Sequence, residues 1–324
     1  MSIHDANKPK QGVLLLNMGG PAGPDEIGDY LYRLFCDPHI LPLPALLRKA
    51  LARLIAFFRT GKTSHRYAVI GGASPLLAET EKQRAALEES LSMPVAIGMR
   101  YSRPFIQDGV SSLKDRGVNH LVLLPLYPQF SSTTTQSALN YFNQYAQWEG
   151  PALIIESHFD HPGFISTHSR MLSKRLDEGS SAMNTAVVFV AHSIPLSRVR
   201  KGDPYVSQVE STVALISKTI DSGIFTRTAY QSRLGPVKWQ SPTLDDVLEE
   251  LIDKGISRII VHPVSFAAEN LETLFDLDIE FRQKCRDRGL EYIRVPAPGT
   301  DHQYIEALSS AVEDGTHQWE LENA

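Results

Sequence analysis

The stretch AVVFVAH, residues 186–192, is a continuous apolar run that ends in one histidine, His192. A short run without polar alternation is typical of a strand that is buried on both faces, as in a parallel sheet. Similar runs recur from one end of the chain to the other, and longer segments with helical periodicity separate them. This alternation predicts an α/β protein in which helices connect parallel strands.

Eight apolar runs give the expected strands, four in each half of the chain: 12–17, 94–100, 119–126, 152–157, 185–191, 226–232, 257–264 and 291–295. The expected helices are 25–35, 79–91, 135–148, 162–177, 243–253, 268–286 and 302–314. The sequence therefore predicts two Rossmann-like doubly wound lobes, each with a four-stranded parallel sheet flanked by helices. Because such sheets bind ligands beyond the carboxyl ends of their strands, we expect a ligand cleft between the lobes.

The segment WEGP, residues 148–151, is the expected boundary between the lobes, because a glycine and a proline interrupt the periodic pattern there. The N-terminal lobe would then span 1–150 and the C-terminal lobe 151–296. Residues 297–324 are expected to form a final helix that packs back on the N-terminal lobe.

The composition is that of a soluble globular protein, with 42% hydrophobic and 21% charged residues among 324. A net charge of -5 offers no basic surface to a nucleic acid. The N-terminus lacks the apolar core of a signal peptide, and no run of eighteen apolar residues is present. Two cysteines, Cys36 and Cys285, provide neither a disulfide framework nor metal-ligand spacing. We therefore expect a cytoplasmic protein without a nucleic-acid partner.

A run of acidic residues follows the strand expected at 257–264. On a helix of 3.6 residues per turn, Glu272, Asp276 and Glu280 lie at i, i+4 and i+8, and Glu269 lies one turn earlier on the same side. Like charges in this arrangement destabilise a helix by roughly 0.2–0.5 kcal/mol per pair. A metal cation bound along the row would offset that cost. A solvated acidic face is the other interpretation.

His192 has the residue type of a proton acceptor at neutral pH, because an unperturbed imidazole has a pKa of about 6.5. A histidine at the end of a strand is otherwise a satisfied structural residue, which is also the interpretation that we favour for His262 inside its own strand. The acidic row at the same sheet edge favours the catalytic interpretation of His192.

The glycine-rich segment GVLLLNMGGPAGP, residues 12–24, connects a strand to a helix but lacks the G-x-G-x-x-G spacing of a dinucleotide site. The Walker pattern is absent as well, so we expect no nucleotide. These glycines would instead let a flat ligand approach the backbone closely. The sequence also contains no His-Glu-x-x-His, Cys-x-x-Cys or Gly-x-Ser-x-Gly motif.

An amphipathic helix is expected at 43–59, where leucine and phenylalanine side chains share one face and Arg48, Lys49, Arg53 and Arg59 share the other. One interpretation is an ordinary helix that faces the core. The other is a helix that contacts a membrane surface or an apolar ligand. Arg100, at the end of its strand, also has two interpretations. It is either solvated at the end of the strand or binds a carboxylate through its planar guanidinium.

Five motifs in order along the chain resemble the ferrochelatase family, whose members insert ferrous iron into a porphyrin. They are YPQFS at 127–131, AHSIP at 191–195, RKGDPY at 200–205, YQSRLGP at 230–236 and LETL at 271–274. The resemblance extends over almost the whole chain. It implies a chelatase that converts protoporphyrin IX and ferrous iron to haem, with coproporphyrin III, another tetrapyrrole chelation or a non-catalytic porphyrin carrier as alternatives.

The resemblance also implies roles for individual residues. His192 and Glu272 would be the catalytic pair, facing each other across the porphyrin, and both would contact the metal together with Asp276 and Glu280. Glu269 and Asn270 would stand beside this pair, and segment 43–59 would form a lip that touches membrane. The porphyrin would be lined by Met18, Tyr67, Ser74, Arg100, Tyr101 and Phe266.

Two positions depart from patterns found in the family. Some members carry a histidine where this chain has Asn270, and some bind an iron–sulfur cluster through C-terminal cysteines, where this chain has Cys285 alone. We therefore expect no cluster and no other resident cofactor, with porphyrin and a divalent metal as the partners of a monomeric protein that contacts membrane peripherally.

Overall fold

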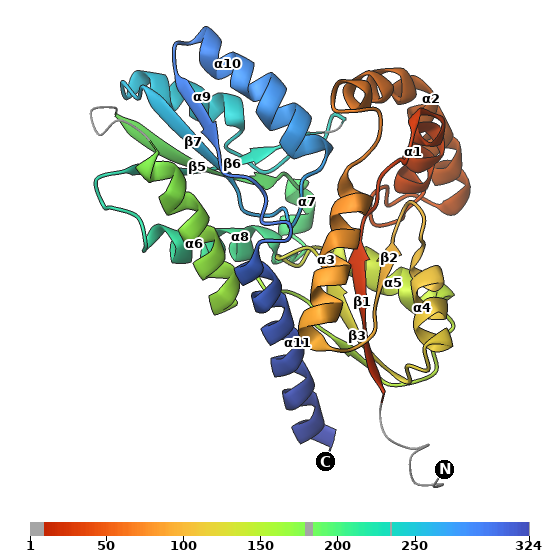
Figure 1. The fold of residues 1–324 in the computed structure, drawn as a ribbon. Helices are drawn as coiled ribbons and strands as arrows, with labels where there is room; N and C mark the ends of the chain where they lie inside the picture. Colours follow the sequence, from red (N-terminus) through yellow and green to blue (C-terminus); the bar gives the residue numbers. More distant parts are fainter. Residues whose placement is uncertain (1–9, 179–183, 234, 324) are drawn as a thin grey trace, which may run out of the picture.

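The computed structural model describes residues 10–178, 184–233 and 235–323 and contains two lobes, each built on one sheet (Figure 1). Both sheets are parallel throughout and have four strands. The strand order is β2-β1-β3-β4 in the first and β6-β5-β7-β8 in the second, so the two lobes repeat one topology. The predicted fold class is confirmed.

All eight predicted strands are present. They are β1 (Gln11–Asn17), β2 (Val95–Met99), β3 (His120–Pro125), β4 (Ala152–Ile154), β5 (Thr185–His192), β6 (Phe225–Gln231), β7 (Arg258–Pro263) and β8 (Glu291–Arg294). The strands β5 and β7 are buried along almost their whole length, which explains their continuous apolar sequences.

The helices flank both sheets, except that the first two along the chain pack mainly on each other. The helices are α1 (Ile27–Phe35), α2 (Ala45–Val69), α3 (Leu76–Leu91), α4 (Ile106–Asp115), α5 (Thr135–Tyr145), α6 (Pro162–Asp177), α7 (Leu196–Val199), α8 (Tyr205–Ser217), α9 (Leu244–Asp253), α10 (Arg282–Asp287) and α11 (His302–Asn323), with a short 3₁₀ turn η2 (Pro24–Glu26). The sequence analysis missed α4, α7 and α8. The first and last of these contain several serines and threonines, which weaken a helical pattern, and α7 is a single turn.

The helix predicted at 268–286 differs in kind from the prediction. Its central part, η3 (Glu272–Phe281), is a π-helix, and an α-helical winding returns only in α10. A π-helix closes its hydrogen bonds over five residues instead of four and is commonly found at functional sites. The prediction of a continuous α-helix was therefore wrong, and the faces assigned on a period of 3.6 need correction.

The chain passes from the first sheet to the second later than the predicted boundary at residue 150. Strand β4 pairs with β3, with Leu121 opposite Ala152, so the first lobe includes residues 152–154. The chain also returns to this lobe at its end. Side chains of α11, among them Tyr304 and Leu308, join the buried cluster that contains Val13 and Leu15 of β1. Figure 1 shows α11 lying beside α3.

Two buried amide side chains hydrogen-bond one lobe to segments that follow the other sheet. Gln83 of α3 donates to the carbonyl oxygens of Ala267 and Gly299, both at 2.9 Å. Gln129, after β3, donates to the carbonyl oxygen of Val264, after β7, at 3.2 Å. Because these donors and acceptors are removed from water, losing any one of them would leave a buried polar group unpaired. The amides therefore hold the carboxyl edges of the two sheets in a fixed relation.

Helix α2 places its large apolar side chains in solvent. Leu46, Phe57 and Phe58 are 84%, 77% and 72% exposed, whereas the residues that it buries are small or polar, such as Ala52 and Ala56. The interpretation of this segment as an ordinary core-facing helix is therefore wrong. The helix also continues ten residues past its predicted end at 59. Within the described residues, no helix combines the length and hydropathy that a membrane span requires.

His262 is a core residue, as the sequence indicated. Its side chain is fully buried, and its Nε2 lies 2.7 Å from Nδ1 of His168 on α6. Burial lowers the pKa of His168 to about 4 and that of His262 well below its ordinary value. Both rings are therefore neutral at physiological pH, which fits a structural role between α6 and β7.

Candidate active site

The carboxyl ends of both sheets open into one cleft of about 770 Å³. Asn17 and Met18 at the end of β1 line it from the first lobe, and His192 at the end of β5 lines it from the second. In each sheet the second strand along the chain pairs on one side of the first strand, and the third strand pairs on its other side. Doubly wound sheets bind ligands at the carboxyl edge where the strand order reverses in this way. The volume lies within the range typical of small-molecule sites, about 300–1,000 Å³.

His192 and Glu272 form an ion pair inside the cleft. His192 is the last residue of β5, Glu272 is the first of η3, and Nδ1 of the imidazole lies 2.9 Å from Oε2 of the carboxylate. This distance leaves no room for a macrocycle between them. The expectation that the two residues face each other across the porphyrin was therefore wrong, and both reach the cleft from the same side.

Two residues of the neighbouring strand support the carboxylate. Gln231 is the partner of His192 in the β5–β6 register, and its Nε2 donates to Glu272 Oε2 at 2.9 Å. Ser232 adopts a left-handed backbone conformation with φ of 63°, which is strained for a serine. Its hydroxyl lies 3.4 Å from Glu272 and 3.5 Å from Asp276, so it bridges the two carboxylates.

The ion pair shifts the pKa values of both partners. Burial lowers the pKa of His192, but the charge of Glu272 and the hydrogen bond to it outweigh burial, so the net pKa is raised. Burial raises the pKa of Glu272, and the charge and hydrogen bonds of His192, Gln231 and Ser232 outweigh it, so the net pKa is lowered. The pair therefore favours imidazolium and carboxylate, and His192 is not the unperturbed base that the sequence suggested.

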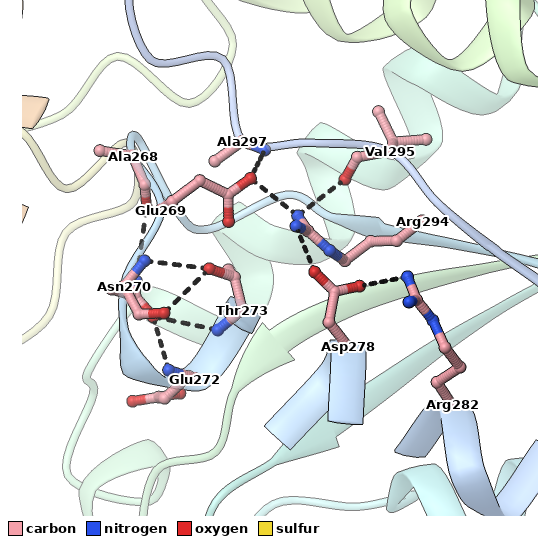
Figure 2. Close-up of polar contacts among 10 residues, drawn as sticks. All are labelled: Ala268, Glu269, Asn270, Glu272, Thr273, Asp278, Arg282, Arg294, Val295 and Ala297. Atoms are coloured by element: carbon pink, nitrogen blue, oxygen red, sulfur yellow. Dashed lines mark hydrogen bonds and ion pairs between the residues drawn. The ribbon is translucent and has the colours of Figure 1, made fainter. Parts of the chain in front are cut away.

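The acidic row divides between two sides of η3. Asp276 and Glu280 line the cleft with Glu272, but Glu269 does not. Glu269 precedes the helix and pairs with Arg294 at 2.9 Å, pointing away from Glu272 (Figure 2). The expectation that Glu269 continues the row on the same side was therefore wrong.

A protein side chain supplies the cation that the acidic row requires. Arg66, near the end of α2, forms an ion pair with Asp276 and lies 3.9 Å from Glu280. Its guanidinium also stacks over Phe275 of η3, 4.7 Å from the ring centroid. One arginine thus connects α2 to Asp276 and Glu280 of η3.

The sequence as a whole is similar to known proteins. A family model described as Ferrochelatase matches residues 10–316. The chain belongs to the ferrochelatase family. It is therefore a chelatase, a lyase that inserts iron into a porphyrin in haem biosynthesis, and iron is its substrate.

Individual relatives share much of the sequence. The ferrochelatase of Synechococcus elongatus is 39% identical over 320 residues, which cover 95% of this chain and 83% of the relative. That of Aquifex aeolicus is 39% identical over 312 residues, covering 94% and 99%. Among solved structures, SirB from Bacillus subtilis with Fe³⁺ has a TM-score of 0.55 at 13% identity and covers 94% of this chain and 95% of its own. This last similarity concerns the fold alone.

Asn270 caps the helix that carries Glu272. Its Oδ1 accepts hydrogen bonds from the backbone N–H groups of Glu272 at 2.8 Å and Thr273 at 3.1 Å (Figure 2). An asparagine in this position satisfies N–H groups that the first turn leaves unpaired. Asn270 therefore fixes the start of η3 rather than exchanging protons.

All six residues expected at the porphyrin surface line the cleft: Met18, Tyr67, Ser74, Arg100, Tyr101 and Phe266. Arg100 is not a solvated terminus; of the two interpretations, binding to a carboxylate is correct, and the carboxylate belongs to the protein itself. Its Nη2 pairs at 2.9 Å with Asp37, whose side chain is fully buried, and Tyr101 donates its hydroxyl to the same carboxylate at 2.7 Å. Asp37 lies in a loop without periodicity, so no sequence pattern indicated this pairing.

The sequence placed Arg59 on the polar face of this helix, but Lys62 and Arg66 were missed because the predicted helix stopped at residue 59. Arg59, Lys62 and Arg66 recur at helical spacing and all line the cleft. Burial lowers the pKa of Arg59, and the like charge of Arg66 lowers it further. An anionic ligand group would relieve both effects.

Removing the charge of Glu272 is expected to lower the pKa of His192 by about 1 pH unit or more, because burial would then act without the opposing carboxylate. Glu272→Gln keeps the size of the side chain. The measurement is an NMR titration of the His192 ring, and Glu280→Gln serves as a control that leaves the pair intact. The same His192 pKa in Glu272→Gln and the unchanged protein would contradict this account of the pair.

Proposed function

We propose that the cleft binds protoporphyrin IX, that ferrous iron enters along η3, and that His192 and Glu272 act together on protons and metal. The observation that supports this most is the 2.9 Å contact between His192 Nδ1 and Glu272 Oε2 within the cleft. The contact joins a titratable nitrogen to a carboxylate oxygen, which is a ligand that hard cations prefer. A reaction that exchanges protons for a dication requires both kinds of group.

The walls of the cleft suit a flat apolar molecule with a few carboxylates. Met18, Tyr67 and Phe266 offer apolar and aromatic surface, and Arg59 and Lys62 offer positive charge. A protoporphyrin has this combination, and its two carboxylates match the small number of cations. Contact with these walls can be used to distort the macrocycle, so that its nitrogen lone pairs become accessible on one face.

His192 would accept a pyrrole proton through Nε2, because Nδ1 is engaged with Glu272. This nitrogen is free of a proton only above the raised pKa of His192, so metallation should increase as the pH rises through that value. A dication that binds Glu272 would draw the carboxylate's charge away from the imidazole and promote loss of its proton. Two protons leave the porphyrin as one iron enters, and no electron is transferred.

The metal would pass from Glu280 to Asp276 and then to Glu272. The side chain of Glu280 is 53% exposed and that of Asp276 only 17%, so the route leads from solvent to the interior. Ser232, which bridges Asp276 and Glu272, continues it. Stepwise replacement of water by carboxylate oxygen avoids the cost of stripping a dication in one step. Arg66 has to leave Asp276 as the metal arrives.

The proposal includes no resident cofactor. Cys36 follows α1 in the first lobe, whereas Cys285 is buried in the core of the second, so the two thiols cannot ligate one cluster. We also propose that the protein acts as a cytoplasmic monomer whose helix α2 rests on a membrane. Exposed leucines and phenylalanines beside arginines and lysines are typical of a helix that lies in an anionic lipid surface.

His192→Ala is expected to reduce metallation by a factor of about 10² or more, because the proton acceptor is lost. Binding of protoporphyrin, measured by fluorescence quenching, should persist because the cleft walls are intact. The rate is followed from the absorption spectrum of protoporphyrin mixed with ferrous or zinc ion. His302→Ala, at an exposed position, is the control, and full turnover by His192→Ala would overturn the assignment.

The metal route predicts opposite effects at two positions. Glu280→Gln should raise the apparent KM for ferrous ion, because it removes the outermost ligand. Arg66→Gln should lower it, because it removes the cation that competes for Asp276. Steady-state kinetics at saturating porphyrin measure both values, and Glu313→Gln on the exposed face of α11 is the control. A change of the same sign in both variants would rule out competition between Arg66 and the metal.

The membrane contact predicts that Phe57→Ser with Phe58→Ser will weaken binding to vesicles of anionic phospholipid, measured by co-sedimentation. Binding should also decrease with added salt, because the basic side chains contribute through screened charges. Tyr145→Ser, which removes an exposed aromatic ring from α5, is the matched control. Equal sedimentation of both variants would exclude α2 as the lipid-binding surface.

A further inference from the structure

A second charged network lies behind η3, on the side away from Glu272 (Figure 2). Its centre is Arg294, the last residue of β8, whose side chain is only 9% exposed. The guanidinium donates to Glu269 Oε1 at 2.9 Å and to Asp278 Oδ2 at 2.7 Å. The other oxygen of Asp278 accepts a hydrogen bond from Arg282 at 3.0 Å. Glu269 Oε1 also accepts the backbone N–H of Ala297 at 3.0 Å.

The two carboxylates that Arg294 binds belong to different parts of the helical segment. Glu269 lies in the loop before η3, and Asp278 lies in its second half. One rigid fork therefore connects the loop, the helix and the end of β8. Neither carboxylate lines the cleft, whereas Glu272 and Asp276, between them in sequence, do. The direction in which Glu272 points is thus constrained from the opposite side of its own helix.

The winding of η3 makes such a constraint necessary. A π-helix is rare, and an α-helical winding over the same residues would turn the side chains after Glu272 to different directions. A planar guanidinium that holds two carboxylates at once fixes both their spacing and their orientation. Burial lowers the pKa of Arg294, but Asp278 and Glu269 outweigh it and raise the pKa, so the charge of the arginine is permanent.

We propose that Arg294 is a positioning residue, which clamps Glu269 and Asp278 so that η3 presents Glu272 to His192 at hydrogen-bond distance. The effect of this positioning on turnover rests on the function proposed above, but its effect on the contact between His192 and Glu272 does not. Arg294 touches neither the cleft nor the reacting groups and acts only through the helix.

The test uses substitutions that keep the approximate size of a side chain and weaken the contacts between Arg294 and its carboxylates. Arg294→Lys keeps the charge but lacks the fork, and Glu269→Gln keeps the shape but lacks the charge. Arg282→Gln is the matched control, because it removes the more exposed contact of the same Asp278. The readouts are the pKa of His192 by NMR, the KM for zinc ion, the Kd for protoporphyrin and the melting temperature.

Arg294→Lys and Glu269→Gln are expected to lower the pKa of His192 by up to about 1 pH unit, toward that of Glu272→Gln, because the carboxylate moves away from the ring. The KM for zinc should rise while the Kd for protoporphyrin stays constant, and Arg282→Gln should change none of these. If Arg294→Lys does not fold, Glu269→Gln provides the same readouts.

A lower melting temperature with the His192 pKa unchanged would overturn the proposal, because Arg294 would then stabilise the fold without orienting Glu272. Unchanged values throughout would also overturn it. If the pKa falls as expected but the unsubstituted protein itself does not metallate porphyrin, the positioning role stands and the proposed function fails, so the two failures are distinguishable.

Discussion

The contact between His192 and Glu272 is the interaction on which the rest of the site depends. The carboxylate of Glu272 is largely shielded from water, and the charge of each group favours the charged form of the other. The end of β5 and the start of η3 have to meet for the contact to exist. The pairing of β5 with β7 in the parallel sheet brings these two chain segments together, and the cap by Asn270 fixes the start of η3.

The two sides of helix η3 make different contacts. Toward the cleft it presents carboxylates, two of which lie beside Arg66. Away from the cleft it presents Asp278, which Arg294 holds together with Glu269. The contacts on the cleft side are made by Arg66 of α2 and include the partly exposed Glu280, so these side chains can change partners. The contacts on the other side are partly buried and connect the helix to the end of β8, so they hold the helix in place.

Much of this arrangement could be predicted from sequence, because buried parallel strands leave continuous apolar runs and place their last residues at one edge. That reasoning found the strand positions and His192. It could not find the π-helical winding, since periodicity was judged against 3.6 residues per turn. It placed Glu269 on the wrong side because it extended the helix over a residue that lies in the loop before η3. Nor could it find Arg66 or Asp37, whose partners are distant in sequence and are selected by tertiary packing.

The most direct test of the central claim is a crystal structure of the protein with protoporphyrin bound. Both members of the ion pair should lie on one side of the macrocycle, with a pyrrole nitrogen within about 3 Å of His192 Nε2 and the Nδ1 contact to Glu272 preserved. A macrocycle that separates the imidazole from the carboxylate, or one that is bound away from both, would contradict it.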